Sequence, residues 1–197
     1  MTEDCVPGPG ARILRWRDIG KPEAVLAALD AIFFEASGTK TFASDDDRKA
    51  FRERWLGRYL AHDPQWAYVA LAPDGTPEGT VAGYLVAARD DPALAPRFAD
   101  IGYFPALGAF TRAFPAHLHI NLAPAYRGSG LGKRLIEAFL ADAAAAGVPG
   151  VHVVTGRGMR NVRFYLAAGF DELTVFPWQG KELVMLGRAI GGPRPLA

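Results

Sequence analysis

The most informative part of the sequence runs from Ile120 to Leu135 and reads I-N-L-A-P-A-Y-R-G-S-G-L-G-K-R-L. It passes from β-forming residues through a turn with alternate glycines into a helical pattern. Gly128, Gly130 and Gly132 leave backbone N–H groups uncovered by side chains at the start of that predicted helix. A helix N-terminus has unpaired N–H donors and a partial positive charge, so it attracts anions such as a pyrophosphate. We therefore expect a phosphorylated ligand at this turn.

The spacing of these residues excludes two common phosphate-binding loops. Arg127 and Lys133 add positive charge beside the glycines. A Walker loop needs G-x-x-x-x-G-K-[ST], but Lys133 is followed by Arg134, and Arg127 stands five residues before Gly132. A dinucleotide fingerprint needs G-x-G-x-x-G, and here its last position holds Lys133 or Leu135. An ordinary structural turn remains the alternative, although such a turn does not need alternate glycines.

Outward from this stretch, the chain alternates predicted strands and helices. Periodicity predicts helices at 21–36, 44–61, 130–146 and 161–168, and the run Ser44-Asp45-Asp46-Asp47 supplies capping residues for the second of them. Strands are expected at 11–18, 65–72, 80–88, 116–123, 151–155, 173–178 and 182–186. A turn is expected at 73–77, and the proline-rich segment 90–115 has room for a short helix. This order predicts a mixed sheet covered by helices.

Two motifs together carry a family resemblance. Arg127–Gly132 matches R-x-x-G-x-G, and Asn161–Phe170 reads N-V-R-F-Y-L-A-A-G-F, which resembles an F-Y-x-x-x-G-F helix. Both motifs, separated by one helix and one strand, resemble the acyl-CoA signature of the GNAT superfamily of N-acetyltransferases. The resemblance is strong over Ala116–Phe170. Within it, His117–Ile120 (H-L-H-I) resembles bacterial relatives of the acetyltransferase-like domain of O-GlcNAc hydrolases.

The resemblance implies an α/β fold of the GNAT type. Its sheet is mixed and mostly antiparallel, has six to seven strands flanked by helices, and splays between the strands at 116–123 and 151–155. We expect a disordered N-terminus at 1–10, a single domain at 11–190 and a loose C-terminus at 191–197.

The implied function is transfer of the acetyl group of acetyl-CoA, the co-substrate, to a primary amine by direct attack in a ternary complex. Backbone N–H groups near Leu122 would hold the thioester carbonyl and stabilise the developing oxyanion. The residues implied in cofactor binding are Asn121, Leu122, Arg127, Gly128, Ser129, Gly130, Leu131, Gly132, Lys133, Asn161 and Tyr165. The alternative is a non-catalytic acyl-CoA-binding sensor or a degenerate acetyltransferase. A module without any ligand is a further rival.

Tyr165 stands at the family's position for the catalytic acid that protonates the leaving thiolate; the alternative role is a core aromatic. The group that removes the proton from the acceptor amine is not decided: His117, His119 and a chain of water molecules are the alternatives. Both histidines alternate onto one strand face, whereas the family's acceptor-facing positions fall on Ala116 and Leu118. A bulge in the strand would reverse that assignment.

Three further features qualify these expectations. His152 on the neighbouring strand makes a three-histidine metal site conceivable, but no Asp, Glu or Cys ligand is near in sequence, so we predict no metal.

Where the family has Asn and Ala before its tyrosine, this chain has Gly158 and Asn161. The aromatic residues that either wall an acceptor cleft or fill the core are Trp55, Tyr59, Tyr103, Phe104, Phe110 and Phe114.

Composition limits the partners and the location. The formal net charge of +1 without charge runs predicts no nucleic-acid partner. No apolar run reaches the ~18 to 20 residues of a membrane span. The acidic start M-T-E-D lacks the pattern of a signal peptide, and Cys5 is the only cysteine, so we expect a cytoplasmic protein. The acceptor is expected to be a small-molecule or peptide amine, with a homodimer as an open alternative.

Overall fold

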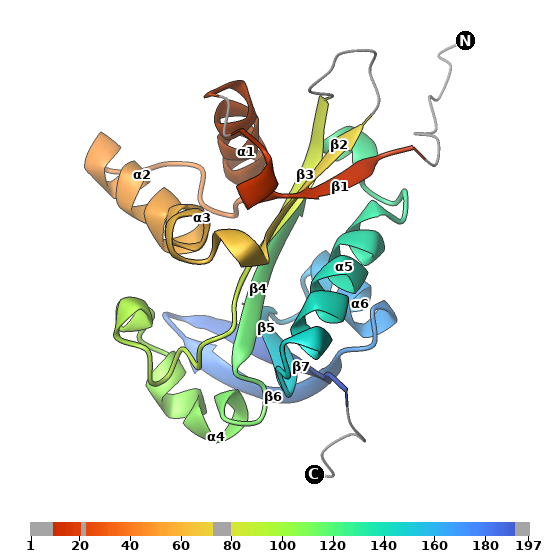
Figure 1. Cartoon of the computed structure of the whole chain (residues 1–197). Coiled ribbons are helices and arrows are strands. Elements are labelled where there is room, and N and C mark those ends of the chain that lie inside the picture. Colours follow the sequence, from red (N-terminus) through yellow and green to blue (C-terminus); the bar gives the residue numbers. More distant parts are fainter. Residues whose placement is uncertain (1–9, 21–22, 73–79, 192–197) are drawn as a thin grey trace. The chain divides into compact units, whose positions relative to one another are not determined.

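The computed structural model describes residues 10–20, 23–72 and 80–191, and these form a seven-stranded sheet of order β1-β2-β3-β4-β5-β7-β6 (Figure 1). Antiparallel pairing joins β1 to β2, β2 to β3, β5 to β7 and β6 to β7, whereas β4 and β5 pair in parallel. The predicted mixed, mostly antiparallel sheet is therefore confirmed. The strands are β1 (Arg12–Arg15), β2 (Ala67–Ala72), β3 (Thr80–Ala88), β4 (Ala116–Leu122), β5 (Gly150–Gly156), β6 (Asp171–Trp178) and β7 (Lys181–Ala189).

The helices follow the predicted order, with one irregularity. The α-helices are α1 (Glu23–Ala36), α2 (Asp45–Arg52), α3 (Arg58–His62), α4 (Gly108–Thr111), α5 (Leu131–Ala145) and α6 (Arg160–Ala167). Short 3-10 turns are η1 (Trp16–Asp18), η3 (Pro64–Trp66), η4 (Pro96–Phe98), η5 (Phe104–Leu107) and η6 (Pro124–Tyr126). Between α2 and α3 lies a π-helical turn, η2 (Glu53–Gly57), where the sequence predicted one uninterrupted helix. Periodicity alone does not reveal such a turn, because a single wide turn leaves the apolar stripe in place.

The chain divides into two compact units. Of the described residues, the first comprises 10–20, 23–72, 80–87 and 119–139, and the second comprises 88–118 and 140–191. Pairing of β4 with β5 is seen at Ala116–Val151 and His117–His152, within the second unit. The predicted splay between these strands involves the part of β4 in the first unit and stays a prediction, as does the single domain at 11–190. Apart from Gly10 and Gly191, the predicted loose termini lie outside the described residues, as does the predicted turn at 73–77.

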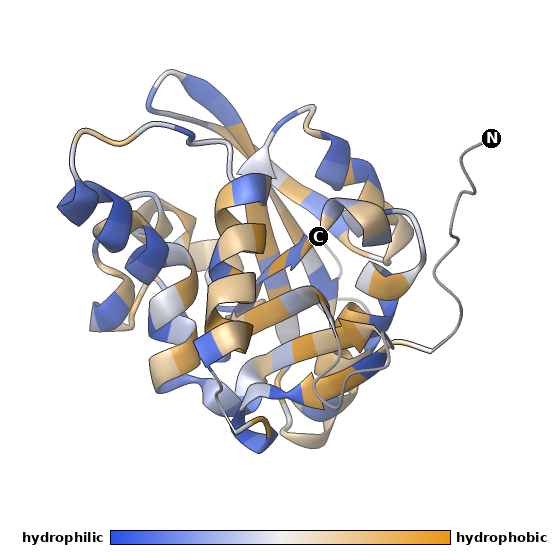
Figure 2. Cartoon of the chain, turned by 90° about the horizontal axis from the view of Figure 1, so that it is seen from above, coloured by the Kyte–Doolittle hydropathy of each residue, from blue (hydrophilic) through white to orange (hydrophobic). Residues whose placement is uncertain are grey.

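In the first unit, α1, α2 and α3 lie on one side of β1–β3, and the first turns of α5 lie on the other (Figure 1). The stripe predicted for α1 is buried at Val25, Leu29, Ile32 and Phe33. Every residue of β2 is buried as well. Colouring by hydropathy shows apolar strands and helices with an apolar and a polar side (Figure 2). Burial of apolar surface is the main favourable contribution to such a core.

The cap predicted for α2 is confirmed. The Ser44 side chain accepts a hydrogen bond from the Asp47 backbone N–H at 3.1 Å, and its hydroxyl donates to the Asp47 carboxylate at 2.8 Å. This reciprocal arrangement satisfies an N–H group that the first helical turn leaves unpaired. The cap therefore sets the start of α2 directly after Ser44, at Asp45.

In the second unit, Phe114 fits between two glycines. A Cβ atom at Gly150 would lie 2.7 Å from the Phe114 ring, and one at Gly187 would lie 3.0 Å from it. Real Cβ atoms hardly ever approach so closely, so glycine at both positions allows the ring to pack against the backbone of β5 and β7. The Phe114 carbonyl is thereby placed next to β5.

Candidate active site

The glycine turn before α5 has the open backbone that the sequence predicted. Gly128 and Gly130 have φ angles of +80° and +82°, which side-chain-bearing residues rarely adopt. Apart from their own chain neighbours, no atom lies within 4 Å of a Cβ built at either position, so the space beside both glycines is open. The Ser129 hydroxyl donates to the Tyr126 carbonyl at 2.7 Å and fixes the turn. The first N–H groups of the 15-residue α5 are presented beside it.

The Arg127 side chain connects the turn to neighbouring elements. Its Nε donates to the Leu122 carbonyl at 3.1 Å, and its guanidinium forms an ion pair with Glu35 of α1. The Arg127 side chain thus ties the end of β4 to α1, a role that the sequence did not indicate. Lys133 is exposed on α5 and lies 3.7 Å from Glu137, one helical turn on. Its position at the start of α5 matches the predicted one.

The Asn121 side chain forms a hydrogen bond inside the protein. Its Nδ2 donates to the Tyr84 hydroxyl oxygen at 2.7 Å. Burial raises the pKa of Tyr84 above its ordinary value, and the hydrogen bond from Asn121 opposes that shift. Next to this pair, a Cβ at Gly83 would lie 2.8 Å from the Asn121 carbonyl and 2.4 Å from the Leu122 side chain. Glycine in β3 therefore permits close approach of the end of β4.

His119 belongs to a polar and aromatic cluster in the first unit, which we call the His119 cluster: Trp55, Tyr59 and His119. The His119 Nε2 lies 3.0 Å from the Tyr59 hydroxyl, and its ring packs edge-on against Trp55 at 5.3 Å. The π-helical turn η2 carries Trp55. π-Helical turns are often found at functional sites. Sequence periodicity placed both aromatic residues on one helix face but did not pair them with a histidine.

His117 lies in the second unit and has a different environment. It is 3% exposed and stacks on His152, with ring centroids 5.5 Å apart. His152 is fully buried, and its Nδ1 lies 2.6 Å from the Phe114 carbonyl. Burial lowers the pKa of His152 to about 4, although the hydrogen bond to Phe114 opposes this shift. At neutral pH the imidazole is therefore neutral, with its Nδ1–H donating to Phe114.

Tyr165 is 6% exposed on α6 and packs against Phe170, with ring centroids 5.5 Å apart. Burial raises the pKa of its hydroxyl above the ordinary value, so the group is protonated at neutral pH. On the same helix the Asn161 side chain pairs with the Thr155 hydroxyl at 3.0 Å. Gly158, where the family has asparagine, has a φ angle of +78°.

The aromatic residues considered for an acceptor wall have different environments. Tyr59, Tyr103, Phe104 and Phe114 are buried, whereas Trp55 and Phe110 are half-buried. Tyr103 packs against Phe104 and Trp178, and burial raises its pKa above the ordinary value. In the second unit these contacts favour the core alternative for the three buried side chains.

The described residues show neither a metal-binding cluster nor a membrane-spanning helix. Within residues 10–20, 23–72 and 80–191, no three or more His, Cys, Asp and Glu side chains lie close enough to hold a metal ion together. None of the helices in the same ranges combines the length and apolar character that crossing a membrane would need. The predictions of a cytoplasmic location, of a possible homodimer and of no nucleic-acid or membrane partner stay predictions.

Comparison with known proteins identifies the family. The model of the acetyltransferase (GNAT) family matches residues 29–170, which include both motifs. The chain belongs to the acetyltransferase (GNAT) family. Membership confirms the predicted enzyme class, an acetyl-CoA-dependent N-acetyltransferase, and its co-substrate, acetyl-CoA.

Several solved structures share the fold. A structure named SsHAT has a TM-score of 0.67 at 22% identity, over 92% of this chain and 98% of that one. The acetyltransferase yncA from Salmonella typhimurium, solved with its cofactor acetyl-CoA, has a TM-score of 0.59 at 17% identity over 95% and 98%. A phosphinothricin acetyltransferase from Sinorhizobium meliloti, in complex with acetyl-CoA, has a TM-score of 0.59 at 20% identity over 92% and 89%.

Proposed function

We propose that this GNAT enzyme transfers the acetyl group of acetyl-CoA to a primary amine, which attacks the thioester directly in a ternary complex. The observation that carries the proposal is the open glycine turn at Gly128 and Gly130, which presents backbone N–H groups at the start of α5. A pyrophosphate suits this place because the donors and the helix dipole both favour an anion. Backbone N–H groups of Gly128–Gly132 would bind it, and Lys133 would add positive charge.

Arg127 acts in this proposal mainly as a positioning residue. Its guanidinium is engaged by Glu35 and by the Leu122 carbonyl, so it holds the turn against the end of β4. The backbone near Leu122 is the proposed place of the thioester carbonyl. Asn121 supports this backbone through its hydrogen bond to Tyr84. Fixed donors that meet a developing oxyanion are a large source of catalysis.

The acceptor amine must lose a proton. An amine with a pKa of about 10.4 is mostly protonated at pH 7, and its neutral form costs roughly 4.6 kcal/mol. We propose His119 as the base, because it is half-buried and Tyr59 orients it. The Tyr59 hydroxyl, 3.0 Å from Nε2, fixes the orientation of the ring, and a neutral imidazole is basic enough to take a proton near neutral pH. His117, stacked on His152 in the core of the second unit, is the weaker candidate.

The leaving group needs a proton in turn. The amine nitrogen bonds to the carbonyl carbon, the carbon–sulfur bond breaks, and the thiolate takes a proton from Tyr165. As the amide forms, the nitrogen releases its second proton to solvent. Supporting this role, Tyr165 occupies the family's position, and its burial keeps the hydroxyl protonated at neutral pH. Asn161, engaged with Thr155, is proposed to line the path of the pantetheine. Solvent then restores both protonation states.

The acceptor is a small-molecule or peptide amine, and the narrower resemblance to relatives of O-GlcNAc hydrolase domains stays a prediction. Release of free thiol, measured with acetyl-CoA and a panel of lysine peptides, polyamines, arylamines and amino sugars, identifies the class. The same panel without turnover, in a protein that binds acetyl-CoA, would favour the non-catalytic sensor.

The proposed cofactor site is tested at Gly130. Gly130→Asp places a carboxylate where the pyrophosphate is proposed and should weaken acetyl-CoA binding at least about 100-fold, or about 2.7 kcal/mol. Gly130→Ala is the matched control, because it shares the unfavourable φ angle of +82° but adds no charge. Acetyl-CoA at ~100 times its dissociation constant should stabilise the wild type by roughly 2.7 kcal/mol. Equal affinity of wild type and Gly130→Asp would refute the assigned site.

A further inference from the structure

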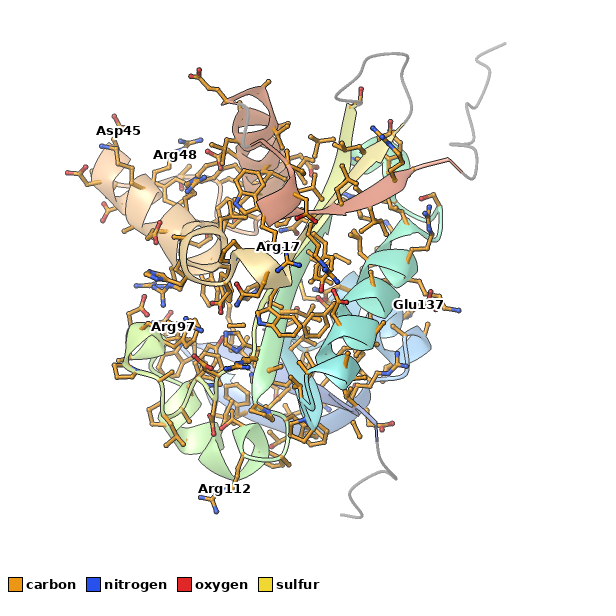
Figure 3. The ribbon with its side chains drawn as sticks, in the orientation of Figure 1. Arg17, Asp45, Arg48, Arg97, Arg112 and Glu137 are labelled. Atoms are coloured by element: carbon orange, nitrogen blue, oxygen red, sulfur yellow. The ribbon has the colours of Figure 1, made fainter. Side chains whose placement is uncertain are left out.

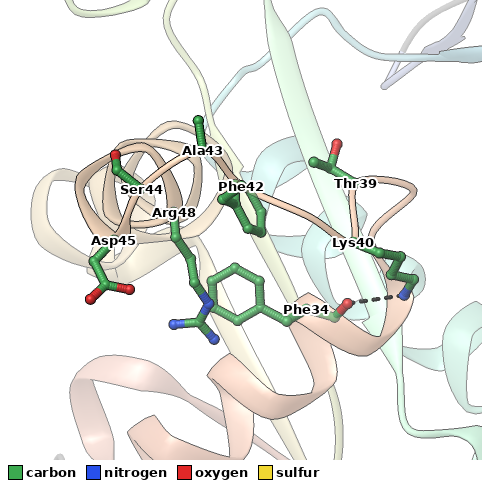
Figure 4. Close-up of a pocket in the computed structure, with 8 residues that line it drawn as sticks. All are labelled: Phe34, Thr39, Lys40, Phe42, Ala43, Ser44, Asp45 and Arg48. Atoms are coloured by element: carbon green, nitrogen blue, oxygen red, sulfur yellow. Dashed lines mark hydrogen bonds between the residues drawn. The ribbon is translucent and has the colours of Figure 1, made fainter.

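A pocket of about 620 Å³ lies in the first unit, where the segment after α1 meets the start of α2 (Figure 4). We call it the α1–α2 pocket; the lining residues that matter here are Phe34, Lys40, Phe42, Asp45 and Arg48. Pockets of about 300–1,000 Å³ are typical of small-molecule sites. None of these side chains belongs to the residues assigned above to acetyl-CoA or to the chemistry.

Phe34 and Phe42 supply the apolar part of the pocket. Their rings meet edge to face, with centroids 5.9 Å apart, and Phe42 also packs against Phe51 at 5.3 Å. Both lining rings are only half-buried. The rings are thus fixed by neighbouring aromatics while part of their surface stays accessible. A flat apolar group bound there would remove that surface from water.

Arg48 supplies the charged part. Its Cζ lies 3.7 Å from the centroid of the Phe34 ring, so the guanidinium is held by the aromatic face (Figure 4). Among the residues that the structure describes, it has no carboxylate partner. A guanidinium presents its N–H groups in a fork that fits the two oxygens of a carboxylate. Stacking on Phe34 restricts this fork in advance of binding.

The other charged groups near the pocket are already engaged or lie at the helix start. Lys40 donates from Nζ to the Phe34 carbonyl at 3.1 Å and to the Glu35 carbonyl, and so closes the C-terminal end of α1. Asp46 pairs with Lys49 at 3.2 Å, and Asp47 bonds to the Ser44 cap. Asp45 is the lining carboxylate; Figure 3 labels it beside Arg48 on α2. Lys40 and Arg48 together outweigh its single negative charge.

We infer that the α1–α2 pocket binds a small carboxylate with a flat apolar body, its carboxylate on Arg48 and its body on Phe34 and Phe42. The inference uses none of the residues assigned to acetyl-CoA and does not depend on the proposed reaction.

Phenylacetate is the probe for this inference. Titration of the full chain without acetyl-CoA, followed by amide chemical shifts, should give a dissociation constant of about 1 mM, typical of a fragment of this size. Shifts should centre on Phe34, Phe42 and Arg48. Arg48→Gln should weaken binding at least about tenfold. Lys49→Gln is the matched control: it removes the same charge from the next residue of α2, does not line the pocket, and should leave affinity unchanged.

Two further ligands test the chemistry. Phenethylamine, which replaces the carboxylate with an ammonium, should not bind. If it bound as tightly as phenylacetate, Asp45 would be the group that recognises the ligand, and the inference would be overturned. Inorganic phosphate should bind more weakly than phenylacetate, and equal affinity would show that the apolar body contributes nothing. If the amide shifts of Phe34, Phe42 and Arg48 did not approach saturation at 20 mM phenylacetate, the inference would also be overturned. Acetyl-CoA affinity of Arg48→Gln, measured in parallel, separates a failure here from a failure of the proposed function.

Discussion

The buried His152 makes the protein sensitive to mild acid. Its pKa is about 4 in the folded protein because burial disfavours the charged imidazolium, whereas the ordinary value is 6.5. Between these values the unfolded chain binds the proton and the folded chain does not. His152 therefore favours the folded state fully above pH 6.5, and this contribution falls as the pH drops towards 4.

The size of the effect follows from the two pKa values. The full difference corresponds to about 3 kcal/mol, and about 2 kcal/mol of it is lost between pH 7 and pH 5. For a chain of this length that is a fall in Tm of about 4–8 °C. Asp91, whose charge favours the imidazolium, and the Phe114 carbonyl both act against the shift, but burial outweighs them.

The assay compares free energies of unfolding in urea at pH 7 and pH 5 for three proteins. His152→Asn keeps a donor close to the Nδ1 position that faces Phe114 and removes the titration, so its loss on acidification should be about 2 kcal/mol smaller than that of the wild type. His62→Asn, at an exposed position, should behave as the wild type does. Carboxylates titrate in all three and cancel in the comparison. The same pH dependence in wild type and His152→Asn would refute the reasoning, as would a resonance assigned to the His152 imidazole that titrates near 6.5.

Four other predictions concern the site and its support. Tyr165→Phe should lower kcat about 100- to 10,000-fold and leave acetyl-CoA affinity unchanged. The control Tyr68→Phe, on β2, should leave kcat unchanged. An unaffected kcat in Tyr165→Phe would show that Tyr165 is not the acid. His119→Asn should lower kcat at pH 7 by about 100-fold and regain activity as the pH approaches the pKa of the amine, and a flat pH profile would count against a base at this position. Gly83→Ala should destabilise the protein by about 1–3 kcal/mol in urea unfolding, because the added Cβ would lie 2.8 Å from the Asn121 carbonyl. Ser44→Ala should cost about 1 kcal/mol through loss of the α2 cap, with turnover retained; no change in stability would show that the cap is dispensable.

Local patterns predicted most of the elements. The helix over 130–146 and the strand over 80–88 appear as α5 (Leu131–Ala145) and β3 (Thr80–Ala88), because both sequences have strong periodicity or β-forming residues and clear ends. The irregular features were less visible. The π turn Glu53–Gly57 leaves apolar spacing almost unchanged, and β6 extends two residues before its predicted start because pairing with β7, not propensity, decides where it begins.

Consecutive residues were enough to predict the family and the co-substrate, and they also indicated the glycine turn that is proposed to bind an anion, because glycine spacing and helix start are local properties of the chain. Which distant side chains meet became clear from the folded chain alone. It paired Arg127 with Glu35, Tyr59 with His119, and His117 with His152, across separations that carry no sequence signal. It also decided burial, and burial sets the pKa of His152, since the cost of a charge depends on everything that surrounds it.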